Sequence, residues 1–444
     1  MRAMRKWGVV LAVFLAAAMP SRAMAEEEAG DSRDTRIEEL ERAVRELVEQ
    51  VWALKEEHEA EKAAAKEEYE TLTHLSAQVE EMGTSPLLDS ESWVNKFTLG
   101  GYGEAHANFE EGPSGDQFDI HRAVLYLGYD FSDWIKFHSE TEIEHALVSS
   151  ESDGELLFEQ IYLDFLLSDP LNVRVGRVLT PLGIINKKHE PPTFYGVERP
   201  SFDRVIIPTT WSSDGVGIFG SLTPSLKYEA YVVGGLDGSG FNDLNGIRGG
   251  RIEERASLHE PAFTARLDYY PFALREVGYG QALRLGASTY AGGLDNGNEG
   301  DDPGVDGDIQ IYSGDFEYTI SRFDFRGVTA FENIDGAREI GNGAAEEIFG
   351  WYLEGGYHFW PEAWKKGKLA KSDAVAFVRY DDFDTQYDMP SGVERNPDGD
   401  RNEWTVGMSF YFLPNLVFKA DYQFRDSEGD DPGDAFNLGL GWQF

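Results

Sequence analysis

The segment 181–213 carries a local excess of basic side chains in a chain whose formal net charge is -41. The basic residues of this segment are Lys187, Lys188, His189, Arg199 and Arg204. Rings of charged side chains in a narrow passage attract ions of the opposite sign. If the segment lies at such a constriction, these residues would draw anions toward it. The alternative is an ordinary external loop of balanced charge, since Glu190, Glu198 and Asp203 lie in the same segment.

Charged side chains also recur at every second position in many stretches after residue 96, opposite an apolar set. Alternation of this kind gives a β-strand two faces that meet different surroundings. Unpaired ions are costly to bury, so an interior charged this heavily predicts a water-filled lumen. Acidic residues are as frequent as basic ones on the polar face, which leaves the ionic selectivity open. The residues that we expect in the lumen include Arg122, Lys136, Glu140, Glu142, Glu144, Arg174, Arg266, Arg284, Arg322, Arg326, Arg379, Arg401, Lys419 and Arg425.

Strands must position these residues, and the C-terminal stretch shows their pattern most clearly. There Phe436, Leu438, Leu440 and Trp442 alternate with small or polar residues. Most such stretches are long enough for a tilted strand to cross the hydrocarbon core of a bilayer, which takes about 9–11 residues. Sixteen of them are predicted, at 97–108, 118–130, 133–147, 155–167, 171–180, 214–222, 225–235, 260–271, 281–292, 308–320, 322–334, 347–360, 374–384, 401–413, 415–426 and 434–444.

The connections between the predicted strands alternate in length. Short turns, such as those at 168–170 and 223–224, alternate with long acidic or Gly-rich loops, such as 181–213 and 236–259. Outer-membrane barrels have short periplasmic turns and longer external loops, whereas a soluble sandwich has no reason to sort its loops in this way. The sequence therefore predicts an all-β fold, a 16-stranded antiparallel transmembrane β-barrel preceded by an α-helical coiled coil.

The region before the barrel has its own patterns. Residues 1–25 have the basic start, short apolar core and Ala23-Met24-Ala25 cleavage pattern of a signal peptide. Residues 26–83 include a seven-residue apolar register that predicts a periplasmic coiled coil. A solvated single helix is the alternative for this stretch. Residues 84–96 form the predicted linker, and residues 97–444 form the predicted outer-membrane barrel.

Composition excludes several functions. The 444 residues include no cysteine, which excludes disulfides and thiolate metal sites. An acidic surface repels phosphates, so binding to nucleic acid is not expected. The 9 histidines have no metal-ligand spacing, so neither a metal site nor a cofactor is predicted. Because no G-x-S-x-G or H-E-x-x-H pattern occurs, the sequence also predicts that the protein is not an enzyme.

Short motifs spread over the predicted barrel resemble one family. They are Phe97-Thr-Leu-Gly-Gly-Tyr-Gly-Glu, Phe118-Asp-Ile-His-Arg-Ala, Val173-Arg-Val-Gly-Arg, Thr180-Pro-Leu-Gly and Arg199-Pro-Ser-Phe. With the signal peptide and the acidic coiled coil, they resemble the phosphate-selective porin O and P family. The resemblance implies a trimeric outer-membrane porin that draws anions past basic residues. In the general porin plan the loop after the fifth strand, here 181–213, folds into the bore.

The predicted function is passive diffusion of small hydrophilic solutes or ions through the outer membrane, with the anion or phosphate preference that the resemblance implies. The predicted partners are outer-membrane lipid, further copies of the chain in a homotrimer, small hydrophilic solutes and, through the coiled coil, peptidoglycan. The alternative function is a structural anchor that tethers the envelope to peptidoglycan. A sheath for a periplasmic electron carrier is a third hypothesis, and it needs a separate cytochrome because the chain has no C-x-x-C-H motif.

Overall fold

The computed structural model describes residues 93–111, 116–145, 154–252, 259–273, 281–294 and 307–444. These residues belong to one compact unit, Trp93–Phe444. The predicted signal peptide, the predicted coiled coil and residues 84–92 of the predicted linker lie outside the described residues. Within the described ranges, no helix has the length and apolar character needed to cross a membrane.

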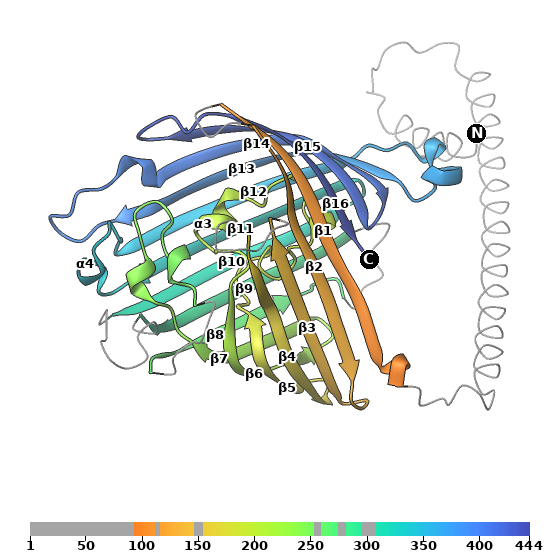
Figure 1. The fold of residues 1–444 in the computed structure, drawn as a ribbon, viewed down its shortest axis with the longest axis horizontal. Helices are drawn as coiled ribbons and strands as arrows, with labels where there is room; N and C mark the ends of the chain where they lie inside the picture. Colours follow the sequence, from red (N-terminus) through yellow and green to blue (C-terminus); the bar gives the residue numbers. More distant parts are fainter. Residues whose placement is uncertain (1–92, 112–115, 146–153, 253–258, 274–280, 295–306) are drawn as a thin grey trace, which may run out of the picture. The chain divides into compact units, whose positions relative to one another are not determined.

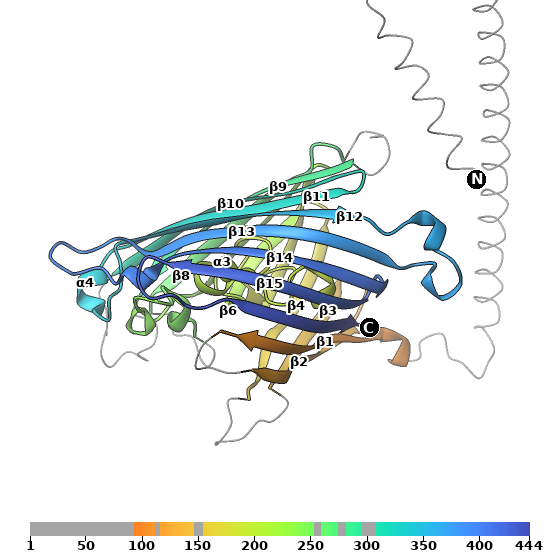
Figure 2. The same cartoon turned by 90° about the horizontal axis from the view of Figure 1, so that it is seen from above.

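Sixteen antiparallel strands close into a barrel in which each strand pairs with its sequence neighbours and β1 pairs with β16 (Figure 1, Figure 2). This confirms the predicted barrel, and most strand ends lie within a few residues of the predicted ones. The strands are β1 (Phe97–Glu110), β2 (Gln117–Asp130), β3 (Ile135–Glu144), β4 (Leu156–Ser168), β5 (Leu171–Leu179), β6 (Ser212–Thr223), β7 (Leu226–Gly234), β8 (Pro261–Tyr269), β9 (Gln281–Gly293), β10 (Asp308–Ile320), β11 (Phe323–Ile334), β12 (Glu347–His358), β13 (Asp373–Asp388), β14 (Asp400–Leu413), β15 (Leu416–Ser427) and β16 (Ala435–Gln443).

The strands have an apolar outer face and an inner face of different character. In β14, Trp404, Val406 and Met408 are exposed on the outside, whereas Glu403 and Thr405 are buried inside. A closed sheet suits a membrane because every strand finds a hydrogen-bonding neighbour and no edge meets lipid. The alternation in the sequence therefore reflects lipid on one side of the wall and the barrel interior on the other.

The two ends of the barrel differ in their connections, which are mostly long after odd-numbered strands and mostly short after even-numbered ones. We call them the long-loop end and the short-turn end. Both views place α3 within the ring of strands, whereas α4 lies at the long-loop end (Figure 1, Figure 2). The short helices are η1 (Trp93–Lys96), η2 (Pro191–Thr193), α3 (Ser201–Val205), η3 (Gly238–Gly240), η4 (Arg248–Gly250), α4 (Ala337–Ile340), η5 (Glu362–Trp364), η6 (Gly367–Leu369) and η7 (Pro397–Gly399).

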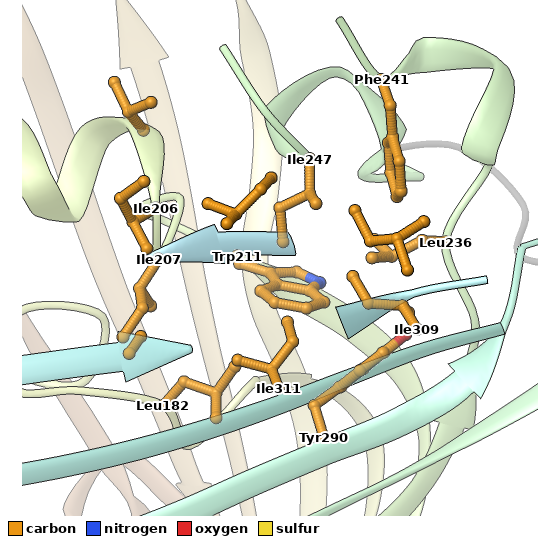
Figure 3. Packing of buried hydrophobic residues seen from close by; sticks show 14 of the residues in the cluster. Leu182, Ile206, Ile207, Trp211, Leu236, Phe241, Ile247, Tyr290, Ile309 and Ile311 are labelled. Carbon is orange, nitrogen blue, oxygen red and sulfur yellow. The ribbon is translucent and has the colours of Figure 1, made fainter. Parts of the chain in front are cut away.

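Part of the interior is packed with apolar side chains, which differs from the charged lumen that the sequence predicts. The ring of Trp211, from the connection between β5 and β6, lies 4.8 Å from the ring of Tyr290 on β9, centroid to centroid (Figure 3). Residues 180–211 and 235–252 fold inward and cover this part of the wall, and close-packed apolar atoms leave no room there for water. Other members of the cluster are Leu182, Ile206, Ile207, Leu236, Phe241, Ile247, Ile309 and Ile311.

Candidate functional site

The connection 180–211 lies inside the barrel and is attached to opposite walls; we call it the inward loop. On one wall, the backbone nitrogen of Val197 donates to a carboxylate oxygen of Asp421 on β15, at 2.6 Å. On the other wall, Nη1 of Arg266 on β8 donates to the carbonyl oxygen of Gly183, at 2.9 Å. Because β8 and β15 lie on opposite sides of the closed sheet, the inward loop spans the bore.

Charged side chains on the inner wall alternate in sign along a row that crosses neighbouring strands. The register places Arg284 (β9), Glu317 (β10), Arg326 (β11), Glu354 (β12) and Arg379 (β13) opposite one another in turn. Nε of Arg284 is 2.6 Å from Glu317, and Nε of Arg326 is 3.0 Å from Glu354. The second oxygen of Glu354 is 3.7 Å from Nη1 of Arg379. Each carboxylate offsets the adjacent guanidinium groups, so the row contributes little net charge to the interior.

The other predicted lumen residues also have bonding partners. Glu142 and Glu144 both contact Arg122 on β2, and Glu140 lies against His189 of the inward loop. Backbone carbonyl oxygens accept hydrogen bonds from Arg401 and Lys419. The wall bases are thus held by near neighbours and are poorly placed to attract a mobile anion. Carboxylates pair with Arg122, Lys136, Arg174, Arg266, Arg322 and Arg425.

Lys187 and Lys188, two of the predicted constriction residues, are exposed on the inward loop and form ion pairs. Lys187 contacts Glu229, and Nζ of Lys188 is 2.6 Å from Glu317. Lys187 also lines a cavity of about 1090 Å³ near the short turns, which we call the short-turn cavity. Bases and acids are balanced in its lining, which contains Arg174, Lys187 and Lys227 with Asp169, Glu229 and Asp268.

A second cavity, of about 250 Å³, lies toward the long-loop end; we call it the arginine cavity. Its lining includes Arg199 and Arg204, two more of the predicted constriction residues, whereas His189 belongs to neither lining. Basic side chains slightly outnumber acidic ones here, in a chain that is very acidic as a whole. The charged lining residues other than histidine are Arg122, Arg177, Arg199, Arg204, Arg248, Arg251, Glu104, Glu142, Glu144, Glu155 and Glu198.

Arg199, Arg204 and Arg248 form an arginine cluster that has no carboxylate ion pair in the described part of the chain. Nη1 of Arg248 donates to the carbonyl oxygen of Arg204 at 2.8 Å, and Nη2 of Arg199 lies 3.4 Å from the carbonyl oxygen of His189. Nε of Arg199 is buried and finds no hydrogen-bond partner among the described residues. Burial and the nearby charges of Arg251 and Arg204 lower the pKa of Arg248 to about 10. Guanidinium groups gathered in this way can bind an oxyanion, because its oxygens accept paired hydrogen bonds from their N–H groups.

Arg248 and Arg251 are not among the site residues that the sequence predicts, although a signal is present. Both lie in the connection 235–260, in the run Arg248-Gly-Gly-Arg251. The sequence predicts an external Gly-rich loop at 236–259, because its pattern does not show that residues 235–252 fold back over the bore. Two arginines separated only by glycines, in so acidic a chain, were the feature that could have identified them.

Comparisons with known proteins agree with the barrel and its motifs. The sequence profile of the phosphate-selective porin O and P family matches residues 100–437. An uncharacterised protein of Aquifex aeolicus is 32% identical over 385 residues, which covers 82% of this chain and 83% of that protein. Two solved structures also match over 78% of this chain and 97% of their own: OmpF of Salmonella typhi in complex with daunomycin (TM-score 0.50, 12% identity) and the channel DcaP of Acinetobacter baumannii (TM-score 0.48, 15% identity). Because the profile spans most of the chain and the fold is a porin barrel, this protein belongs to the phosphate-selective porin O and P family and is an outer-membrane channel for small solutes.

Proposed function

We propose that the protein mediates passive diffusion of small anions, phosphate among them, and that the arginine cluster sets this preference. The observation that carries the proposal is that Arg199, Arg204 and Arg248 line one cavity without carboxylate partners among the described residues. The bases of the inner wall are paired, so they add little to ion selection. An anion entering the arginine cavity would supply the counter-charge that these residues lack.

An oxyanion forms more favourable hydrogen bonds with the arginine cluster than chloride does. A guanidinium group presents parallel N–H donors that match two oxygens of one phosphate, whereas a monatomic ion accepts without such matching. The arginine cavity, about 250 Å³, has room for an oxyanion together with water, and its protein walls make each charge interaction stronger than in bulk water. Phosphate would then pass along the inward loop toward the short-turn cavity, whose lining includes the exposed Lys187.

We also propose a homotrimer with its long-loop end outside the cell and its short-turn end in the periplasm. Family membership supports the trimer, and the apolar register of residues 26–83 supports association of the chains. The assignment of Lys187, Lys188 and His189 to a pore constriction stays a prediction. A tether to peptidoglycan would use residues 26–83, which lie outside the described residues, so it too stays a prediction.

Single-channel recording in planar bilayers tests the proposed selectivity. Under a KCl gradient, the wild-type reversal potential should show a preference for anions. A triple variant with Arg199→Gln, Arg204→Gln and Arg248→Gln should lose this preference or pass cations more readily. Arg395→Gln is the control for each single Arg→Gln change, because Arg395 carries one charge like each of the three but forms ion pairs with three carboxylates. If the triple variant conducts normally with an unchanged reversal potential, the arginine cluster does not select ions and the proposal is wrong.

A further inference from the structure

One histidine and two glutamates form a buried group inside the barrel. His189 comes from the inward loop, Glu140 from β3 and Glu159 from β4. Their exposed fractions are 3%, 2% and 0%, and their donor atoms all lie within 4.8 Å of one another. Near them in sequence, Lys187 lines the short-turn cavity and Glu142 lines the arginine cavity. The group therefore joins the inward loop to β3 and β4 of the wall.

The distances within the group fit a shared metal ion better than hydrogen bonds. Nε2 of His189 is 3.4 Å from Oε1 of Glu140 and 3.5 Å from Oε2 of Glu159. A charge-assisted hydrogen bond between nitrogen and oxygen is shorter, about 2.7–2.9 Å. Donor atoms bound to one tetrahedral Zn²⁺ at about 2.0–2.2 Å lie roughly 3.3–3.6 Å from one another. Both observed separations fall in this second range.

Another histidine of the chain shows the hydrogen-bonded arrangement for comparison. Nδ1 of His358 is 2.6 Å from Asp373, and its Nε2 is 2.7 Å from Asp324. These are the short contacts expected when an imidazole is clamped between two carboxylates. Other histidine–carboxylate contacts range up to the 3.5 Å between Nδ1 of His121 and Asp119, so the separations around His189 lie at the long end of this range, and His189 differs from His121 in being buried with two such contacts.

Neighbouring atoms hold the three donors in place. Nδ1 of His189 is 3.2 Å from the carbonyl oxygen of Asn186, and donating there leaves the Nε2 lone pair directed at the glutamates. Gln160 donates to Oε2 of Glu140 at 2.6 Å, which fixes that carboxylate. Oε1 of Glu159 is buried and has no hydrogen-bond partner among the described residues. A buried carboxylate oxygen without a donor is unfavourable unless a cation lies beside it.

We propose that Glu140, Glu159 and His189 bind a divalent transition-metal ion of the Zn²⁺ class. One imidazole nitrogen with two carboxylate oxygens is a suitable donor set for such an ion, and a fourth position remains for water. The ion pins the inward loop to β3 and β4 and offsets two buried negative charges beside the route of the anions. Sequence spacing did not predict this site, because its donors come from two strands and a loop. The binding test below needs no ion flow, so its failure is distinct from failure of the proposed selectivity.

Zinc titration of the full-length, detergent-solubilised and metal-stripped protein tests this site. Isothermal titration calorimetry should give one high-affinity Zn²⁺ per chain. Glu159→Gln, which barely changes the shape of the side chain, should weaken that binding by more than about 100-fold, because loss of a direct ligand exceeds loss of an outer-shell partner. Heat-dependent migration in gel electrophoresis should show that the variant still folds.

A second histidine group provides the matched control. Asp119, His121 and His145 also bring donor atoms within 4.8 Å, but they are only partly buried. Nδ1 of His145 is 2.6 Å from Asp119, which is a hydrogen-bond distance. His145→Gln should therefore leave the high-affinity Zn²⁺ site intact.

Cobalt provides a second readout that reports the ligand geometry. Co²⁺ bound to the wild type should show the intense visible absorption of a tetrahedral complex, and Glu159→Gln and His189→Gln should abolish it. The proposal is overturned if the wild type binds neither ion stoichiometrically, or if His145→Gln abolishes binding while Glu159→Gln does not. His189 would then be a buried imidazolium: burial disfavours its charge, but Glu159 and Glu140 outweigh burial and raise the pKa of His189 to about 10.

Discussion

The guanidinium group of Arg248 donates to the backbone carbonyl oxygen of Arg204 at 2.8 Å, so two positively charged residues from different connections are fixed side by side. Arg199 lines the same cavity. Burial, and after it the neighbouring charges of Arg251 and Arg204, lower the pKa of Arg248. An anion that binds there is attracted by the arginine cluster and repelled by the glutamates of the same lining, and the basic side chains are in slight excess.

Phosphate should therefore block chloride current through the wild-type channel, and Arg248→Gln should weaken the block about 10- to 100-fold. The reason is that one hydrogen bond to a charged group contributes about 1.5–3 kcal/mol. The measurement is the dependence of chloride conductance on phosphate concentration in planar bilayers. Arg338→Gln is the control, because Arg338 donates to the carbonyl oxygen of Ser391 and does not line the arginine cavity. Equal block in Arg248→Gln and the wild type would contradict the assignment.

Reversal of the charge on Lys187 should shift the channel toward cations. Lys187 contacts Glu229 in the short-turn cavity, so Lys187→Glu would place two carboxylates together there. The double variant with Glu229→Lys restores an opposite pair and should return most of the reversal potential to the wild-type value. Bilayer recordings of the wild type, Lys187→Glu, Glu229→Lys and the double variant complete the double-mutant cycle. If Lys187→Glu leaves the potential unchanged, Lys187 does not face the conducting path.

Loss of the charge on Glu354 should destabilise the barrel. Glu354 is 2% exposed and contacts both Arg326 and Arg379, and Arg379 is fully buried. Glu354→Gln would leave two buried guanidinium groups without this counter-charge, which costs about 3 kcal/mol. Denaturant-induced unfolding in detergent micelles measures the change. Glu362→Gln is the control, since Glu362 is exposed, and its removal should change the free energy of unfolding little.

The stability of the barrel should respond to pH through Asp203. Asp203 lies in α3, fully buried, and burial together with the charge of Asp381 raises the pKa of Asp203 well above the usual value. A raised pKa means that the folded chain binds this proton more tightly than the unfolded chain. Its contribution is therefore complete below about pH 4, the pKa of an unfolded aspartate, and is lost as the pH rises toward the folded value.

Asp203→Asn cannot ionise, so it should become more stable relative to the wild type as the pH increases. Unfolding curves measured across the range from about pH 4 to pH 8 should show this divergence. Asp431→Asn, at an exposed position, controls for the loss of one carboxyl group. A constant difference between Asp203→Asn and the wild type at every pH would show that Asp203 does not titrate with folding.

The barrel itself was predictable because each strand separates two unlike surroundings. In β16, for example, Phe436 and Leu440 are exposed outside, whereas Asn437 is buried inside, and this period of two is visible in the sequence. The alternation of short and long connections then fixed the antiparallel order of strands. Both signals are local, which is why the strand count and most strand ends agree with the structure.

The apolar part of the interior was not predictable from the same alternation of side chains. Ile311 and Tyr312 are consecutive residues of β10 with large, mainly apolar side chains, yet Ile311 is fully buried and Tyr312 is 54% exposed. Alternation shows that two faces differ, but it does not show whether lipid or a folded loop covers an apolar side chain. The covering residue Trp211 lies far from β10 in sequence, and only the closed fold brings them together.

The candidate site was predictable in part. The segment 181–213 was expected to enter the bore from the family resemblance, and the structure places Arg199 and Arg204 in the arginine cavity. The ion pairs of Lys187 and Lys188 were not expected, because Glu229 and Glu317 lie on strands that the loop reaches only after the barrel closes. The place of Arg248 in the arginine cavity was not predicted for the same reason, because its connection reaches the cavity only after the barrel closes.

The attachment of the inward loop to β8 and β15 has a mechanical consequence. A hollow cylinder flattens when its surroundings press on it unevenly, but a strut across its diameter resists this. Bonds at Gly183 and Val197 join the two walls through one continuous stretch of backbone, so tension or compression in the bilayer is carried across the molecule. The aperture should therefore keep its cross-section when lipid thickness or lateral pressure changes.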